Sequence, residues 1–285
     1  MTVDPSAASS VSASQSISHP MTPEDLRDLS EAKTSLQHHG LADRLTEMVG
    51  APITAAVRHL PGPAENILNS AVDGALQQAL KVAIATIDQD ATGRSRLITH
   101  KILSGLAGAA GGAFGLASVA AELPVSTVLI LRSVADIARS QGEDLEQIEA
   151  RLACLEVFAL DSGGGLDADS SDQADATDIG YFAVRAGMAK QIADASKYLV
   201  QHSMADMTAP PLLQLISKIG SRFGIVVSQK AAAQAIPIIG AVGGALINSY
   251  FIDHYQDLAR AHFTIRRLER TYGESEVRAA YDALD

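Results

Sequence analysis

The stretch ILSGLAGAAGGAFGLASVAA, residues 102–121, carries no charge over twenty positions between Lys101 and Glu122. About twenty apolar residues are what a helix needs to cross the hydrocarbon core of a bilayer. This stretch, however, contains five glycines and seven alanines against only six large apolar side chains. Small residues favour close contact between helices over burial among acyl chains. We therefore expect a helix whose backbone lies close to a neighbouring helix.

The glycines of this stretch fall on one face of the expected helix. Gly105, Gly108, Gly112 and Gly115 are spaced by 3, 4 and 3 residues, as the a and d positions of a heptad are, and Gly111 lies beside them. Each glycine inside a helix costs about 0.5–1 kcal/mol relative to alanine. Close backbone contact would offset this cost, so we assign all five a role in helix packing or membrane contact.

A second charge-free stretch, residues 231–252, lies between Lys230 and Asp253. It contains a proline, which kinks or breaks a helix, and a group of glycines behind it. Its polar residues weaken the case for lipid insertion further. The residues to which we assign the same packing or membrane-contact role are Pro237, Gly240, Gly243 and Gly244.

Charged residues stand close to the first stretch. Glu122 is followed by Leu123 and Pro124, a step that we expect to break the helix. Arg132 is ten positions further on, so that it and Glu122 would face related sides of the break. Either the two pair, or Arg132 reaches the free carbonyls before Pro124. Glu122 and Arg132 then have either a structural role or that of a functional polar pocket.

Most of the remaining sequence has helical periodicity. Between residues 64 and 87 the apolar positions recur at spacings of three and four, which predicts one long amphipathic helix. No run shows sustained period-two alternation. We therefore predict an all-α fold, a helical bundle with two central Gly/Ala-rich segments wrapped by amphipathic helices. Further helices are expected at residues 22–38, 41–49, 124–142, from 143 through 158, 181–202, 210–218, 255–272 and 274–284.

The composition also suggests boundaries along the chain. Residues 1–21 are rich in serine and alanine and lack the basic start and apolar core of a secretory signal, so we expect a disordered tail in a cytoplasmic protein. Residues 22–63 form a small helical extension, and residues 64–285 form the main domain. Residues 161–180, rich in Asp and Gly, are expected to be a flexible insertion.

No catalytic, cofactor-binding or metal-binding residue is assigned. A net charge of −11 argues against nucleic acid, because phosphate binding needs concentrated Lys and Arg. The single cysteine, Cys154, is expected to be a small buried hydrophobe. The acids around residues 167–178 have the spacing of a calcium loop but lack its turn glycine and its final glutamate, which favours a solvated linker.

The order of several segments resembles the EcsC protein family. These are residues 122–138 (ELPVSTVLILRSVADIA), 142–145 (GEDL), 151–160 (RLACLEVFAL), Tyr181 with Arg185, 236–245 (IPIIGAVGGA), 259–263 (ARAHF) and Leu268 with Glu269. The resemblance covers residues 75–272 and leaves the N-terminal 60 residues outside. It implies a bacterial protein named from an operon that also encodes an ABC transporter, and it supplies no reaction.

Three classes of function remain open. The leading hypothesis is a non-enzymatic accessory protein that associates conditionally with membranes. Its partner would be a membrane surface or an integral membrane protein, such as one related to a transporter. The second is a soluble helical module that binds a lipid-like ligand in an apolar groove. The third is an enzyme without a recognisable motif. No cofactor is expected in any of them, and a membrane-associated protein would lie at the inner face of the cell membrane.

Overall fold

The computed structural model describes residues 20–37, 40–50, 52–58, 60, 62–86, 115–161, 173–202, 206–235 and 240–284. Within these residues the regular elements are helices and no strand occurs, so the predicted all-α class is confirmed. The helices are α1 (Pro23–Gln37), α2 (Leu41–Val49), α3 (Ile53–Arg58), α4 (Gly62–Thr86), α6 (Gly115–Ser140), α7 (Ile148–Glu156), α8 (Gln173–Gln201), α9 (Pro210–Gln234), α10 (Gly240–Tyr272) and α11 (Glu274–Ala283), with a 3₁₀ turn η1 (Val157–Ala159) after α7.

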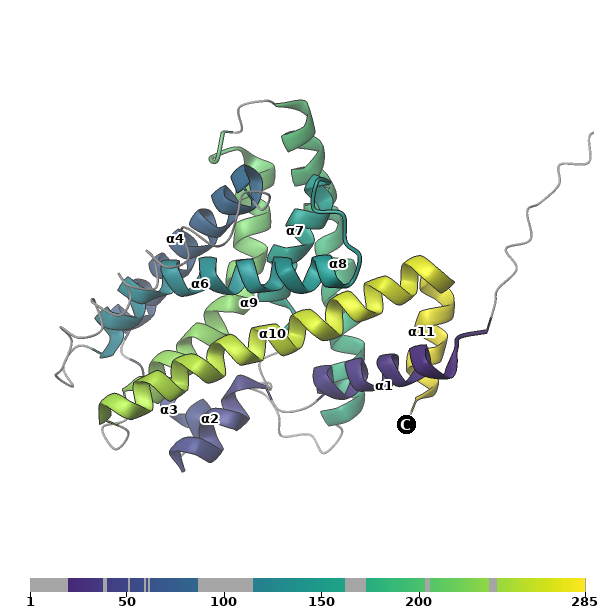
Figure 1. The fold of residues 1–285 in the computed structure, drawn as a ribbon. Helices are drawn as coiled ribbons and strands as arrows, with labels where there is room; N and C mark the ends of the chain where they lie inside the picture. The colour runs from purple at the N-terminus through teal and green to yellow at the C-terminus, as the bar shows by residue number, and fades with distance from the viewer. Residues whose placement is uncertain are drawn as a thin grey trace, which may run out of the picture.

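Four long helices form the centre of the fold. α6 and α10 lie side by side and both begin on the left-hand side of Figure 1. α4 packs against α6 and α9, and α10 also contacts α9. The N-terminal helices complete this core from outside, because α1 packs on α10 while α2 and α3 pack on α9.

The periodic apolar positions of α4 form its buried face. Leu68, Val72, Leu76 and Leu80 are each almost completely buried, at the three- and four-residue spacing of the sequence. Burying one such side chain contributes about 1.5–3 kcal/mol. The long amphipathic helix predicted over residues 64–87 is therefore present as α4, displaced by two residues at its start and by one at its end.

α4 and α9 approach each other closely at a glycine. A Cβ placed on Gly220 of α9 would lie 3.5 Å from Leu76 Cδ1 and 3.5 Å from Asp73 Oδ1 of α4. Gly224, one turn later, faces Asn69 at 3.8 Å. Residue numbers rise along α9 as they fall along α4, so the two helices are antiparallel here. The sequence analysis did not single out either glycine.

The predicted break at Pro124 is wrong, because α6 continues through this residue. Proline has no N–H and its ring crowds the carbonyl four residues earlier, so a proline inside a helix costs about 3 kcal/mol. Apolar burial on both sides of it holds the helix together: Val119, Leu123, Ile130 and Leu131 are fully buried. Tertiary packing has overridden the local preference.

One other predicted helix boundary agrees with the structure, and several differ from it. Gly142 ends the helix as expected, with a φ of +78° and a bond of 3.0 Å from Glu143 N to Ala138 O, the pattern of a Schellman motif. Glu143 and Asp144, however, lie in the non-helical segment between α6 and α7 and do not open α7. α8 begins at Gln173, eight residues before the predicted start and inside the expected insertion. α9 runs to Gln234 instead of residue 218, and α10 begins at Gly240 instead of residue 255, because both helices extend into the second charge-free stretch.

No helix within the described ranges has both the length and the apolar character needed to span a membrane.

Candidate functional site

The glycines of the two charge-free stretches are placed only in part. Gly105, Gly108, Gly111, Gly112 and Pro237 lie outside the described residues. Gly115 is the first residue of α6, and Gly240 and Gly243 lie in the first turn of α10. A Cβ placed on Gly244 would meet no atom of the described residues within 4 Å, so Gly244 makes no close contact with a described helix. For the others the packing role stays a prediction.

A buried lysine connects the two stretches. Lys230, near the end of α9, is 0% exposed and lies directly before the second stretch. Its Nζ donates to Glu122 Oε1 at 3.0 Å, at the end of the first stretch, and to Asn248 Oδ1 at 2.9 Å, on α10. The ring of Phe251 lies 4.3 Å from Nζ. We call these four residues the Lys230 junction.

The Lys230 junction accounts for all three protons of the ammonium. Two of them are taken by oxygens, and the third side of Nζ faces the Phe251 ring, an arrangement that attracts a cation. Burial lowers the pKa of Lys230 from its ordinary value, and the Glu122 carboxylate opposes that effect. The junction therefore ties α6, α9 and α10 together where the charge-free stretches meet the described core.

The predicted pairing of Glu122 with Arg132 is not formed. Ten residues of continuous helix separate the two by about 15 Å along the axis, because α6 does not break at Pro124. Glu122 pairs with Lys230 instead. Within the described part of the chain Arg132 Nη1 is buried without a hydrogen-bond partner. Arg132 therefore does not share a pocket with Glu122.

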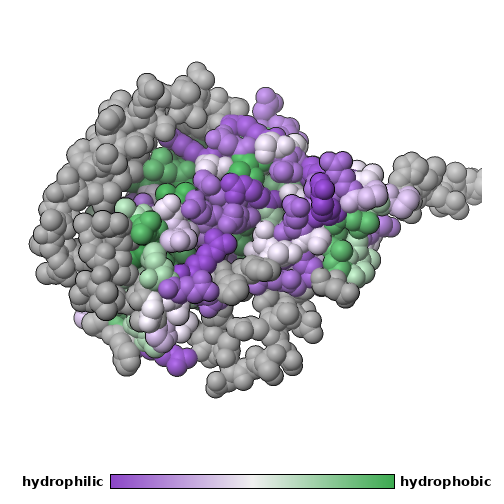
Figure 2. Space-filling model, turned by 60° about the horizontal axis from the view of Figure 1, so that its bottom comes forward, coloured by the Kyte–Doolittle hydropathy of each residue, from purple (hydrophilic) through white to green (hydrophobic). Residues whose placement is uncertain are grey.

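The outward face of α10 exposes two large apolar side chains, beside Ser249, where the second stretch continues into this helix. Leu246 is 48% exposed, and Tyr250, one turn later, is 38% exposed. The first charged residue after them is Asp253. In Figure 2 hydrophobic, green surface appears in small groups on the left, beside the grey atoms, and on the right, whereas the middle of this view is largely hydrophilic.

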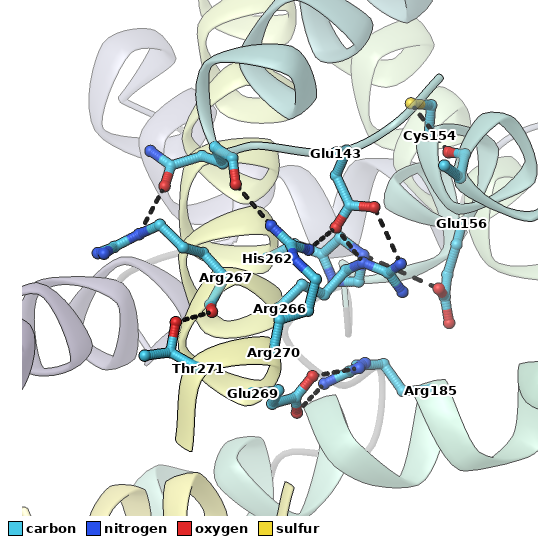
Figure 3. A network of polar contacts seen from close by, with 12 residues as sticks. Glu143, Cys154, Glu156, Arg185, His262, Arg266, Arg267, Glu269, Arg270 and Thr271 are labelled. Carbon is cyan, nitrogen blue, oxygen red and sulfur yellow. Dashed lines mark hydrogen bonds and ion pairs between the residues drawn. The ribbon is translucent and has the colours of Figure 1, made fainter. Parts of the chain in front are cut away.

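A second polar centre lies around the turn between α6 and α7 (Figure 3). Glu143 is almost buried and accepts from Arg266 Nε at 2.8 Å and from Arg270. Although burial raises the pKa of Glu143, the two guanidinium groups of α10 lower it below the usual value. This pairing fixes the turn against α10, in the place where the sequence predicted a helix start.

Helix α8 joins the same centre through an arginine. Arg185 forms a two-bond pair with Glu269 of α10, with distances of 2.7 and 2.8 Å and both side chains largely buried. Such planar, doubly bonded pairs are among the stronger ionic contacts in proteins. Both residues belong to the segments that carry the family resemblance, so the sequence pointed to them, although not to their contact.

His262 of α10 and Glu156 of α7 lie near these two ion pairs (Figure 3), and Tyr181 of α8 contacts His262. The Tyr181 hydroxyl and His262 Nδ1 are 3.0 Å apart, and His262 Nε2 lies 3.9 Å from Glu156 Oε2. Nearby Cys154 is fully buried, and burial raises the pKa of its thiol to about 12. Cys154 is therefore an unreactive core residue, as expected. We call Tyr181, His262, Glu156, Arg185 and Glu269, together with Glu143 and Arg266, the α7–α10 network.

A third buried contact fixes the chain after η1. His254 Nε2 of α10 lies 2.7 Å from Asp161 Oδ2, and Arg222 Nε of α9 donates to Ala159 O at 3.0 Å. The Tyr255 ring lies among Phe158 and Phe223, with centroid distances of 5.1 and 5.8 Å. This contact holds η1 between α9 and α10.

The buried polar groups suit a structural role better than a catalytic one. Lys230, His262 and Glu156 are enclosed by the helices that supply them, so a substrate could not touch them without a rearrangement of the core. Within the described ranges no cluster of three or more His, Cys, Asp or Glu residues could hold a metal ion. A shallow hollow between α8 and α9 is lined by five polar residues and one leucine. Its lining is Gln191, Leu213, Gln214, Ser217, Lys218 and Ser221.

The chain matches the model of a known protein family. The model of the EcsC protein family matches residues 23–268. The match begins at α1 and so includes residues 23–63, which the resemblance had left outside. No curated protein and no solved structure matches the chain.

Proposed function

The chain belongs to the EcsC protein family, and we propose that it is a non-enzymatic accessory protein that associates conditionally with the inner face of a bacterial cell membrane. The two charge-free stretches provide the contact with lipid. They lie against the bilayer without spanning it, and the helical core carries them.

The Lys230 junction is the observation that carries this proposal. It binds the end of the first stretch, Glu122, to Asn248 within the second, through a lysine that precedes the second. Glu122 and Asn248, near the starts of α6 and α10 and more than a hundred residues apart in the sequence, are thereby held together at one end of the bundle (Figure 1). A single surface of the protein would present both stretches to lipid.

The composition of the first stretch argues for a reversible contact. On insertion scales each of its six large apolar residues favours the centre of a bilayer by about 0.3–0.6 kcal/mol. Together they give only about −2 to −4 kcal/mol. Affinity of this size would let the protein move between cytosol and membrane.

The exposed face of α10 supports lipid over a charged partner. Leu246 and Tyr250 offer an aliphatic and an aromatic side chain one turn apart, and tyrosine is enriched at membrane interfaces. The net charge of −11 opposes attraction to anionic lipids. We therefore expect apolar binding that does not need anionic lipid and that high salt does not abolish.

Co-sedimentation of the full chain with phosphatidylcholine vesicles tests the proposal. We expect binding that persists in 0.5 M salt and that falls about tenfold or more in the double variant Leu246→Glu, Tyr250→Glu. Val200→Glu on α8 is a matched control, since Val200 is 72% exposed and its helix belongs to neither charge-free stretch of the sequence. If the unmodified chain stays in the supernatant with all vesicles, or if the double variant binds as well as the control, the proposal is wrong.

A further inference from the structure

Two buried polar groups of the α7–α10 network face each other without a bond. Glu156 Oε2 and His262 Nε2 lie 3.9 Å apart, which is beyond hydrogen-bond range. Both side chains are nearly or fully inaccessible to solvent. In the described part of the chain His262 Nε2 has no hydrogen-bond partner. A buried polar atom without a partner costs about 1–3 kcal/mol in general, so this pair requires an explanation.

The other side of the His262 ring is fixed. The Tyr181 hydroxyl lies 3.0 Å from Nδ1, and it donates to that nitrogen when the imidazole is neutral. The ring hydrogen then sits on Nε2 and is directed toward the Glu156 side. Tyr181 of α8 thus fixes the position of the ring, while Nε2 faces Glu156 of α7.

The charged groups around this pair are already matched to one another. Arg185 of α8 is paired with Glu269 of α10, and Arg266 of α10 is paired with Glu143 of the turn before α7. Glu156 is the one carboxyl of the α7–α10 network without an arginine bonded to it. Among the described residues, a further ionisable group that faces the pair is Tyr181 of α8, whose pKa is raised by burial.

Burial acts on the two groups in opposite directions. It raises the pKa of Glu156 to about 7, against the attraction of Arg185 and Arg266 and with the repulsion of Glu269. It lowers the pKa of His262 well below the ordinary value, and the same two arginines add to that effect. Below neutral pH the carboxyl therefore holds a proton while the imidazole remains neutral.

We propose that the Glu156 carboxyl, which faces the N–H of the neutral His262 ring, carries an exchangeable proton between α7 and α10, and that release of this proton to solvent loosens the packing of α7 on the core. After release, a carboxylate lies buried beside a neutral imidazole with no cation bonded to it, which is an unfavourable state. The pair is thus a pH-sensitive tie that operates near neutrality. It is independent of the membrane contact proposed above.

Amide hydrogen exchange of the full chain at pH 5.5 and pH 8.5, corrected for the intrinsic rate, tests the tie. Between the pKa of Glu156 in the open form and its pKa in the closed form, each unit of pH changes the opening equilibrium about tenfold. With Glu156 titrating near 7, we expect amides of α7 to lose about thirtyfold protection. Glu156→Gln, which mimics the protonated carboxyl, should show no such loss. Glu149→Gln, an exposed position on the same helix, should behave as the unmodified chain.

Nitrogen NMR of the His262 ring in the unmodified chain gives a second reading that does not depend on any variant. We expect a neutral imidazole from pH 9 down to pH 6, with its shifts inflecting near pH 7 as Glu156 releases its proton. The proposal is overturned if no inflection occurs between pH 5 and 9. It is also overturned if protection of α7 is independent of pH, or if Glu156→Gln loses protection as the unmodified chain does.

Discussion

Breaking the Lys230 junction should destabilise the fold through the charge that is left behind. In the variant Glu122→Met the ammonium of Lys230 remains, 0% exposed, with only Asn248 and the Phe251 ring as partners. Removing one partner of a buried ion pair costs about 3–5 kcal/mol. Glu122 keeps some contact with solvent, so we expect the lower end, about 3 kcal/mol. For a chain of this size that lowers the Tm by roughly 6–12 °C.

Removing Lys230 and keeping Glu122 should destabilise the protein less. Lys230→Met leaves Glu122, whose side chain is 10% exposed and can reach water, so we expect a loss of about 1–2 kcal/mol. In the double variant both charges are absent and two apolar side chains of similar volume replace them, which is often neutral or stabilising. The double variant should therefore be more stable than the sum of the single changes predicts, by about 2 kcal/mol or more.

Urea denaturation followed by circular dichroism measures these free energies of unfolding. The exposed i,i+4 pair of Lys190 and Asp194 supplies the control, because Asp194→Ala should cost no more than about 0.5 kcal/mol. The reasoning is refuted if Glu122→Met is as mild as that control. It is also refuted if the two methionine substitutions are strictly additive.

Three further changes have defined outcomes. Gln229 is 1% exposed and neither amide atom has a partner in the described part of the chain, so Gln229→Leu should stabilise the protein by about 1–3 kcal/mol in urea denaturation; a loss would contradict this. Gly108→Leu with Gly112→Leu should cost about 1–3 kcal/mol per site if these glycines contact a neighbouring helix, and unchanged thermal unfolding would show that they do not. The raised pKa of Glu156 contributes stability that is fully present below about pH 4.5 and is lost as the pH rises to about 7. The unmodified chain should accordingly lose about 3 kcal/mol relative to Glu156→Gln between pH 4.5 and 8, and parallel pH curves would exclude that role for Glu156.

Periodicity within one helix was predictable from the sequence. The buried face of α4 follows from apolar residues at spacings of three and four, and the end of α6 follows from Gly142. These features depend on neighbours along the chain, and the sequence lists such neighbours directly. The absence of period-two alternation was similarly sufficient for the all-α class.

Local signals misled where distant packing outweighs them. Pro124 is an unfavourable residue inside a helix, yet the buried residues on both sides of it keep α6 continuous. Glu143 and Asp144 suit the start of a helix, but Glu143 is held in a turn by Arg266 of α10. In each case the deciding contact comes from another segment.

The candidate site could not be found from spacing alone. In the sequence Lys230 only marks the boundary of a charge-free stretch, and its partner Glu122 is 108 positions away. Glu156 looked like one of many helical acids, and nothing local indicates that it faces His262. One signal was present: a lone lysine before a long apolar run has few polar partners nearby, so it must find one at a distance if it is buried.

Hydrogen exchange of the full chain with and without phosphatidylcholine vesicles tests the proposed membrane contact most directly. We predict that vesicles slow exchange in residues 102–121 and 231–252 together, while α7 and α8 exchange as they do in buffer. The concentrations of protein and vesicles should both exceed the expected dissociation constant. Unchanged exchange in both stretches under these conditions would contradict the account.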